Sequence, residues 1–494
     1  MRGGRLRLRF KISMAAVMLG LGIAPALADI KVDGHLTESE WTDAQVFTDF
    51  RVTQPYTLGK PLHPTEVRLI GTPQGIAVGF RCTHPTSTPR IKEQTPRDAD
   101  NQGDRVNIFI DLDADAQVAY NMTFALAGSL QDATITNETQ YSTDWDGDYL
   151  YSIRDTGEEW YVEVLLPWTL ASMKSTSTRR RTIAIAFDRV VGAIQQRSAL
   201  QGVSFSRPRY LSEFPRVEID QYEGSLLHVF PYASAAGDWV DDETDLKFGA
   251  DILWKPAGNF QLTAALNPDF GQVEADELVV NFDAIEVLFS DKRPFFAENQ
   301  ALFDVRVAEN DRLVYTRRIG GARDDDPTRA AEIDAALKIN TSLGRTEVGF
   351  LSAVERDYGD DIGRAFAAQR VRYSSGPWTF GYLGTWTDRP FLDRTALVHT
   401  SDFIWRPNER VSVQALALMS SVDELGTSIE GDGSVLRGTY TPSADWQHQA
   451  VLTHFSRPWT STISVSRNAP ASIARPFRSR AAFATFPRTM RARP

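Results

Sequence analysis

Residues 364–386 read RAFAAQRVRYSSGPWTFGYLGTW, and this stretch places two alternating segments next to each other. In the first, Arg370 and Arg372 alternate with Val371 and Tyr373. In the second, aromatic residues alternate with small or polar ones, and the aromatic positions are Trp378, Phe380, Tyr382 and Trp386. Successive side chains of a β-strand point to opposite faces, so each segment predicts a strand with one apolar face and one polar or small face.

The same alternation runs through residues 216–456 in long segments joined by short turns. The apolar sides include Phe248, Ala250, Ile252, Trp254, Phe260, Leu262, Ala264, Leu266, Ile333, Ala335, Leu337 and Ile339. Apolar-out, polar-in alternation over roughly ten residues is typical of a transmembrane β-barrel, and we count roughly ten such strands. A soluble second sandwich is the alternative, which the long strands and the frequent Gly and Ala disfavour.

Residues 29–215 alternate in shorter segments between turn signals, which predicts an antiparallel β-sandwich. The inward faces are expected to hold Val106, Ile108, Ile110, Leu112, Val162, Val164, Leu166, Ile183, Ile185 and Phe187. Trp41, Trp160 and Trp168 share this alternation and are expected in the core. The predicted fold class is therefore all-β, with an N-terminal antiparallel β-sandwich followed by a transmembrane antiparallel β-barrel.

The two ends of the chain differ from the regions between them. Residues 1–28 have a basic start, a short apolar run and a final ALA, which is the layout of a secretory signal peptide. We therefore expect an exported protein, and no other apolar run is long enough for a spanning helix. Residues 457–494 hold eight arginines and no acid, and their alternation stops. We interpret this tail as out-of-frame or truncated sequence, which leaves an incomplete barrel.

Charge and cysteine content exclude some classes of protein. The net charge is −11, and an acidic exported chain is a poor candidate for binding nucleic acid. The single cysteine, Cys82, has no partner for an intramolecular disulfide, and we expect it to be a small half-buried hydrophobe. His448 and His454 share one face of a predicted strand, and we expect them in the barrel lumen.

Residues 266–296, LNPDFGQVEADELVVNFDAIEVLFSDKRPFF, break the alternation and concentrate carboxylates. The acids are Asp269, Glu274, Asp276, Glu277, Asp283, Glu286 and Asp291. Their spacing is too irregular for one metal shell. We predict a folded insertion over 267–330 that plugs the lumen or lies at its mouth, with the acids facing water, Arg293 or lumen arginines such as Arg370 and Arg372. A structural role is favoured over a catalytic one.

Four pieces of 29–215 resemble family 9 carbohydrate-binding module-like domains: VDGHLTESEW (32–41), GDRVNIFIDLD (103–113), FALAGSLQDATI (124–135) and EEWYVEVLLPWTL (158–170). NPDFGQVEAD (267–276), KRPFF (292–296) and LVYTRRIG (313–320) resemble a family of outer-membrane proteins, DUF5916-like, that pair such a module with a barrel. The tail departs from that family's pattern, which leaves barrel closure open.

The resemblance implies sugar binding, in which aromatic rings stack on sugars and nearby polar groups bind the hydroxyls. Trp145, Tyr149 and Asp146 in STDWDGDYLY are the candidates, because their neighbours are polar and turn-like. The related modules often hold structural calcium. Acids at alternate positions suit a calcium site in two places. One group is Asp144, Asp146 and Asp148, and the other is Asp111, Asp113 and Asp115. The alternative for both is a solvated turn.

Three functions stay open. The first is an outer-membrane protein that binds carbohydrate through its sandwich, which would face the periplasm, while lipid surrounds its barrel. The second is a glycoside hydrolase in polysaccharide catabolism, but the acids are too many to select a catalytic pair and no separate catalytic domain is evident. The third is a structural or assembly protein without a glycan ligand. The first is favoured, with a glycan as partner and no cofactor beyond calcium.

Overall fold

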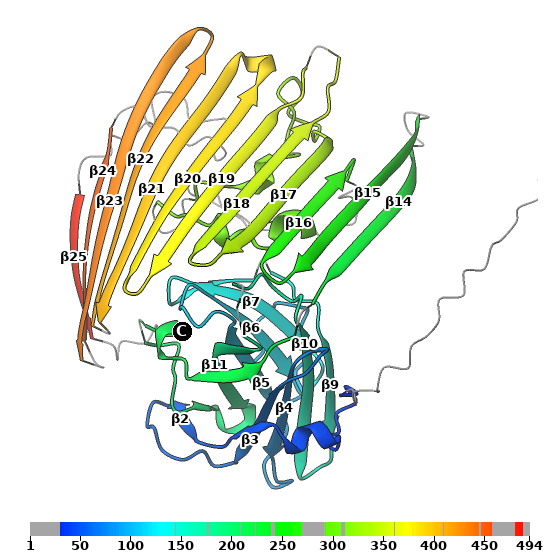
Figure 1. Ribbon diagram of the computed structural model, residues 1–494, viewed down its shortest axis with the longest axis vertical. Coiled ribbons are helices and arrows are strands. Elements are labelled where there is room, and N and C mark those ends of the chain that lie inside the picture. Colours follow the sequence, from blue (N-terminus) through cyan, green and yellow to red (C-terminus); the bar gives the residue numbers. More distant parts are fainter. Residues whose placement is uncertain are drawn as a thin grey trace, which may run out of the picture.

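The chain folds into three antiparallel sheets, two in an N-terminal sandwich and one larger sheet after it (Figure 1). A computed structural model of the full chain describes residues 30–268, 291–456 and 480–487, apart from 144, 175, 177, 208, 223, 239–242, 292, 308–311, 360, 409 and 444–445. The predicted signal peptide, 1–28, therefore lies outside the described residues. Within the described ranges, no helix is both long and apolar enough to cross a membrane.

The sandwich consists of a five-stranded and an eight-stranded sheet. The first has the order β1 (Gln45–Phe47), β3 (Thr65–Gly71), β4 (Gly75–Thr83), β10 (Glu159–Pro167), β9 (Leu150–Asp155). The second has the order β2 (Phe50–Gln54), β12 (Gln196–Leu200), β11 (Arg180–Val191), β5 (Arg105–Asp111), β6 (Val118–Ala125), β7 (Leu130–Thr136), β8 (Gln140–Ser142). A further strand, β13 (Arg216–Asp220), pairs with β11, so this sheet extends past the boundary predicted at residue 215.

The predicted inward faces of the sandwich strands form one apolar core. All ten residues expected there are buried, and Phe187 is fully buried between the rings of Phe47 and Phe80. Trp41, Trp160 and Trp168 are buried as expected. Cys82 is also buried, and burial raises the pKa of its thiol to about 11, so it serves as a hydrophobe. Full burial of a large apolar side chain contributes ~1.5–3 kcal/mol.

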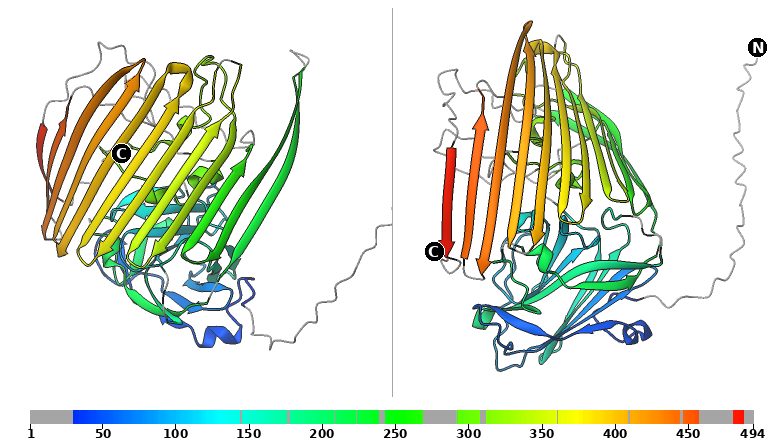
Figure 2. Two further views of the ribbon diagram at one scale, coloured as in Figure 1. Left: turned by 45° about the horizontal axis from the view of Figure 1, so that its top comes forward. Right: turned by 60° about the vertical axis from the view of Figure 1, so that its left-hand side comes forward.

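The third sheet has twelve strands in chain order and is the predicted barrel sheet. They are β14 (Leu226–Asp238), β15 (Glu243–Ala257), β16 (Phe260–Leu266), β17 (Ile333–Leu343), β18 (Thr346–Glu355), β19 (Ala365–Ser375), β20 (Trp378–Arg389), β21 (Arg394–Asn408), β22 (Val411–Glu424), β23 (Thr427–Ser443), β24 (Trp446–Phe455) and β25 (Arg480–Pro487). The sheet curls along its length (Figure 2). Among the described residues, β14 and β25 are its two ends.

The predicted apolar outer face of this sheet is confirmed, whereas the inner face carries both polar and apolar side chains. Phe248, Val371 and Phe380 are 69%, 39% and 50% exposed on the outer face, whereas the intervening Arg370 and Lys338 are buried on the inner face. Two details differ from the prediction. A bulge after Ile333 turns that residue inward, and His448 and His454 lie on the outer face with the exposed Leu452. His454 lies 3.8 Å from Asp432 there, near the end of its strand.

The described part of the insertion packs against the inner face of the sheet. It contains α1 (Pro294–Ala297), η4 (Gln300–Leu302) and η5 (Thr316–Arg318), and its apolar side chains share one cluster with inward residues of the strands. Asp291 pairs with Arg293 and accepts a bond from the Thr316 hydroxyl, each at 2.6 Å. The other acids of 266–296 lie outside the described residues. The described residues between 291 and 319 therefore contact the inner face of the sheet, and the bounds of the insertion, 267–330, stay a prediction.

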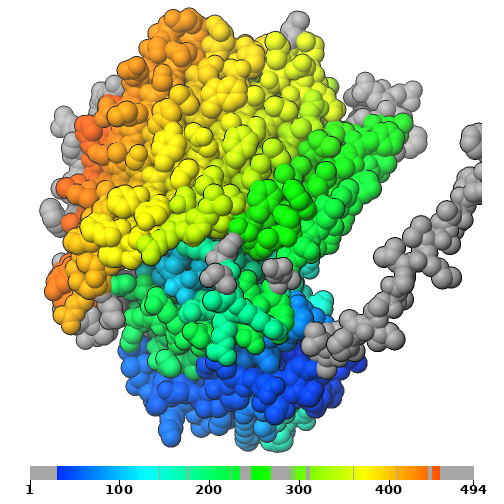
Figure 3. Space-filling model, viewed as in Figure 1, coloured from blue at the N-terminus to red at the C-terminus, as the bar shows by residue number. Residues whose placement is uncertain are grey.

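The sandwich lies against one end of the barrel sheet (Figures 1 and 3). Backbone and side-chain bonds join the two: Met173 N–H donates to Gly258 at 2.7 Å, and Lys255 donates to the Thr169 carbonyl at 2.8 Å. The remaining short helices are η1 (Ser39–Thr42), η2 (Gly192–Ile194), η3 (Leu211–Glu213) and η6 (Pro390–Leu392).

The arginine-rich tail contributes a strand that its composition did not predict. Residues 480–487 form β25, antiparallel to β24. The rest of 457–494 lies outside the described residues, and the origin of the tail stays a prediction.

Candidate functional site

The residues predicted to bind sugar lie at the edge of the sandwich core. Trp145 is only 3% exposed and packs in that core, with its ring 4.7 Å from Tyr120. The polar, turn-like sequence neighbours that made Trp145 a candidate therefore do not place its indole in water. A sugar ring has no open face of Trp145 on which to stack.

Tyr149 and Asp146 are engaged in a network around Asp132, which is fully buried. The Tyr149 hydroxyl and the Arg97 guanidinium both donate to Asp132, and Arg97 also pairs with Asp146 at 2.8 Å. Burial, and next the Asp132 carboxylate, raise the pKa of Tyr149 above its ordinary value. These polar groups hold the 145–149 loop on the sandwich.

The predicted calcium sites gain no support from the geometry. Asp144 lies outside the described residues, Asp146 pairs with Arg97, and Asp148 is exposed. In the parts of the chain that the structure describes, no group of three or more His, Cys, Asp or Glu is placed to hold a metal ion. Calcium binding stays a prediction.

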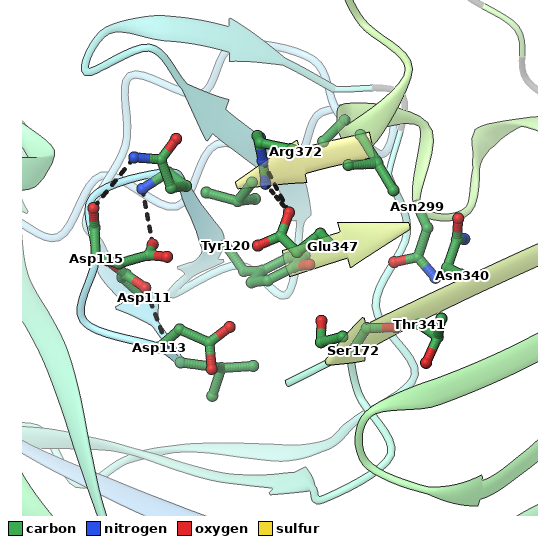
Figure 4. A pocket seen from close by; sticks show the side chains of 16 residues that line it. Asp111, Asp113, Asp115, Tyr120, Ser172, Asn299, Asn340, Thr341, Glu347 and Arg372 are labelled. Atoms are coloured by element: carbon green, nitrogen blue, oxygen red, sulfur yellow. Dashed lines mark hydrogen bonds and ion pairs between the residues drawn. The ribbon is translucent and has the colours of Figure 1, made fainter. Parts of the chain in front are cut away.

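A polar cavity of about 70 Å³ lies where sandwich, barrel sheet and insertion meet (Figure 4). We call the boundary between sandwich and barrel sheet the seam. The sandwich contributes the turn after β5, Tyr120 and Ser172; the sheet contributes Asn340, Thr341, Glu347 and Arg372; the insertion contributes Asn299. Residues more than 200 positions apart in sequence therefore share this site.

The sandwich side of the cavity is a tight turn built around Asp111. Ala114 and Ala116 have φ of 51° and 57°, a left-handed conformation that alanine adopts at a cost. The Asp111 carboxylate accepts the N–H groups of Asp113 at 3.1 Å and Ala116 at 2.7 Å, which stabilises this turn. Burial, and next the Asp115 carboxylate, raise the pKa of Asp111 to about 8.

Ion pairs cross the seam from the sandwich to the barrel wall. Lys174 pairs with Asp115 in the sandwich and lies 3.8 Å from Glu347 of β18. Glu347 in turn accepts the Arg372 Nε–H at 2.8 Å. Burial acts to lower the pKa of Lys174, but the carboxylates of Asp115 and Glu347 hold it above the ordinary value. The charges that line this first cavity are thus largely balanced within the protein.

Two other side chains facing the cavity contain polar atoms without a bonding partner among the described residues. Asn340 is 4% exposed, and neither its amide oxygen nor its amide nitrogen has a partner among the described residues. The Ser172 hydroxyl is likewise buried without a partner within the described chain. A buried polar group left unbonded costs ~1–3 kcal/mol. The cavity therefore favours a polar occupant with hydroxyl or amide groups.

Further inside the barrel, Arg370 and Asp402 form an ion pair with one N–O distance of 3.0 Å. Gly381 lies between them on β20, and a Cβ there would collide with both side chains. This pair lines a second cavity, of about 100 Å³, with Arg437 of β23. Gln117 lines both this cavity and the first, and also a third one at the seam of about 570 Å³. The three cavities therefore adjoin at Gln117.

The carboxylates of the seam are poorly placed for acid and base catalysis. Hydrolysis of a glycosidic bond requires one protonated and one ionised carboxyl facing the same bond. Asp111 is protonated at neutral pH, but both of its oxygens accept hydrogen bonds from its own turn. Asp113 accepts hydrogen bonds from the backbone N–H of Lys174 and from the Arg181 side chain. The arrangement is better suited to binding than to hydrolysis.

Sequence reasoning found part of this site. The acidic run at 111–115 and the inward-facing Arg372 were both noted from the sequence, the run as a possible calcium loop. Ser172 and Asn340 were missed, because alternation places Asn340 inside the barrel but does not say which inward residues meet the sandwich.

Residues 225–350 match the model of DUF5916, a domain of unknown function. This part of the chain is similar to that domain. The match covers β14–β17 and the insertion, and it confirms the family that the 267–276 and 292–296 motifs indicated. A search among curated proteins finds no match to this chain.

Some solved structures are distantly similar. A candidate carbohydrate-binding protein from Bacteroides uniformis is 13% identical, with a TM-score of 0.27 over 35% of this chain and 87% of that one. OmpT, an outer membrane protein of Vibrio cholerae, is 8% identical, with a TM-score of 0.25 over 72% and 88%. Wzi of Escherichia coli, a carbohydrate-binding β-barrel involved in capsule assembly, is 10% identical, with a TM-score of 0.22 over 84% and 80%.

Proposed function

We propose that this protein is an outer-membrane barrel protein that binds a glycan at the seam between its sandwich and its barrel lumen. The outer face of the barrel sheet supports the membrane location. Phe248, Val371 and Phe380 are exposed there beside further large apolar residues, and lipid is the solvent that such a face requires. Calcium and a periplasmic position of the sandwich are further parts of the proposal.

The unbonded amide of Asn340 carries the assignment of the binding site. A sugar hydroxyl both donates and accepts hydrogen bonds, so it can satisfy the amide oxygen, the amide nitrogen and the nearby Ser172 hydroxyl. Gln117 connects this cavity to the two larger ones, which gives room for more than one sugar unit. Binding would therefore involve the seam and not Trp145.

A glycan-binding screen of the full chain in detergent micelles tests the proposal. We expect the wild-type protein to bind at least one oligosaccharide of the panel. Asn340→Leu should weaken that binding by ~10-fold or more, because the hydrogen bonds lost are worth ~1–3 kcal/mol. The same substitution should not destabilise the empty protein, because an unbonded polar group is exchanged for an apolar one.

Thr400→Val is the matched control. Thr400 is also buried on the inner face with an unbonded hydroxyl among the described residues, but it does not line the cavity. Its substitution should leave glycan binding unchanged. Binding to no oligosaccharide would favour the structural or assembly role, and release of sugar by the purified chain would favour the hydrolase.

A further inference from the structure

The largest of the three cavities is a cleft of about 570 Å³ lined by four arginines. We call it the arginine cleft. Arg207, Arg209 and Arg216 come from the end of the sandwich, and Arg406 comes from β21 of the barrel sheet. Arginine presents a planar set of donors that fits a carboxylate with two parallel bonds. Four of them around one cleft make it a candidate site for anions.

Two of the four arginines have no acidic partner within the described residues. Arg207 pairs with Glu213 at 2.7 Å, and Arg406 lies 3.6 Å from Glu138. Arg209 bonds only to the Asn408 carbonyl and the Ser212 hydroxyl, and no partner of the Arg216 side chain is found in the described chain. The arginines thus exceed their acidic partners by two positive charges.

Two of these arginines also have N–H groups that are available for a ligand. The Nε–H groups of Arg209 and Arg406 are buried and have no hydrogen-bond partner within the described residues. The Arg406 side chain is only 9% exposed, so water reaches it poorly. Glu138, its acidic neighbour, already accepts two bonds from Ser212. An anion in the cleft would relieve these unbonded donors.

The acids that line the cleft do not cancel the surplus. Asp115 is held by Lys174, and Glu213 is held by Arg207. Asp111 is engaged by the N–H groups of its own turn and is protonated at neutral pH. The local potential should therefore be positive, although the chain as a whole carries −11.

The rest of the lining fits a sugar better than an isolated ion. Val203, Leu211 and Phe214 belong to a buried apolar cluster beneath the cleft. An apolar floor suits the carbon face of a sugar ring.

The barrel wall of the cleft excludes a lipid tail. Thr379, Ile404 and Arg406 belong to the inner set of alternate residues, opposite the apolar outer face that carries Phe380. A ligand therefore enters from the aqueous lumen or mouth. An acyl chain would have to leave the outer face to reach the arginines.

We propose that the glycan bound at the seam is acidic, and that Arg209, Arg216 and Arg406 hold its carboxylates in the arginine cleft. This inference rests on the proposed function, since it names the class of glycan for the same seam. Gln117 lines both the arginine cleft and the Asn340 cavity, so one oligosaccharide can contact both.

The test compares acidic oligosaccharides with their methyl esters on the full chain in detergent micelles. The probes are oligogalacturonate, oligoalginate and hyaluronan fragments, each with the ester that removes the charge and keeps the backbone. We expect at least one acid to bind ~10-fold or more tightly than its ester. This preference should shrink as salt is raised, because ions screen partly exposed charges.

Arg209→Gln combined with Arg216→Gln should remove the preference for the acid over its ester. Arg180→Gln is the control, because Arg180 is an exposed arginine of β11 that does not line the cleft. Equal affinity for all acids and esters would overturn the inference, as would a preference that survives the double substitution.

Failure of the inference can be distinguished from failure of the proposed function. If esters and acids bind equally and Asn340→Leu weakens both, glycan binding stands and the acidic class is wrong. If no oligosaccharide of either charge binds, both fail. Vesicles of phosphatidylglycerol are tested in parallel. If the protein binds these vesicles through the arginines and binds no oligosaccharide, the anion held in the cleft is a lipid phosphate and not a glycan carboxylate.

Discussion

The sandwich and the barrel sheet use the same alternation of side chains in opposite ways. In β10 of the sandwich, Val164 is fully buried against the second sheet, whereas Val371 in β19 of the barrel sheet is 39% exposed. The residues on either side of Val371 are arginines that point to the inner face. One of them, Arg370, is buried there in an ion pair with Asp402. The period of two therefore sets which residues share a face, and the surroundings decide which face is apolar.

The seam has properties of both regions. Its sandwich side buries a carboxyl, Asp111, that is kept protonated, while its barrel side carries the ion pair of Glu347 and Arg372. Unbonded buried polar atoms occur in the sandwich and on the barrel sheet as well, but those of Asn340 and Ser172 face one shared cavity among the described residues. This is where we propose that the ligand binds.

Removing one buried ring from the sandwich should have the largest effect. Phe187→Ala should lower the free energy of unfolding by ~3–5 kcal/mol, because it deletes a fully buried ring packed against Phe47 and Phe80. Denaturant unfolding of the full chain, followed by the fluorescence of the buried tryptophans, measures this change.

The matched substitution on the barrel sheet is Phe380→Ala. Phe380 is half-exposed on the outer face, so in detergent its loss should cost ~1 kcal/mol or less, within the range of surface substitutions. Equal losses for the two variants would contradict the contrast between a packed core and a solvent-facing apolar surface.

A charge on the outer face should have the next largest effect. Val371→Arg, near the middle of β19, should cost ~2–4 kcal/mol in a bilayer, and Leu343→Arg, at the end of β17, only ~0–1 kcal/mol. Refolding into lipid vesicles at increasing denaturant measures both. A bilayer that tolerates Val371→Arg as well as Leu343→Arg would show that this face does not lie in lipid.

The alternation was enough to predict both regions, including the inward Arg370 and Arg372 and the buried Val162 and Val164. The insertion could be placed at the lumen or its mouth because its carboxylate-rich sequence follows β16 directly and breaks the apolar–polar alternation of the strands. The seam could not be derived, because nothing local in the sequence pairs Asn340 with Ser172. Trp145 was misplaced for a related reason. Its sequence neighbours are acids, but its spatial neighbour is the ring of Tyr120.

The remaining prediction concerns the pH dependence of the seam. Burial and the Asp115 carboxylate raise the pKa of Asp111 to about 8, against about 3.9 for an unfolded aspartate. The folded chain therefore keeps a proton that the unfolded chain releases. The stability from this group is fully present below pH ~4 and is lost as pH rises towards 8. Asp111→Asn, which does not ionise, should remove that part of the pH dependence.

Asp98 provides the control for this measurement, because burial raises its pKa only to about 6. The difference in unfolding free energy between wild type and Asp98→Asn should change between pH ~4 and 6 and then level off. The corresponding difference between wild type and Asp111→Asn should keep changing up to about pH 8. Asparagine at position 111 has one oxygen fewer to accept the N–H groups of Asp113 and Ala116, which changes the unfolding free energy at every pH. The comparison therefore uses the slope of the free-energy difference against pH and not its absolute value. Coinciding curves would mean that Asp111 is not held protonated, and that the seam is as open to water as the surface around Asp98.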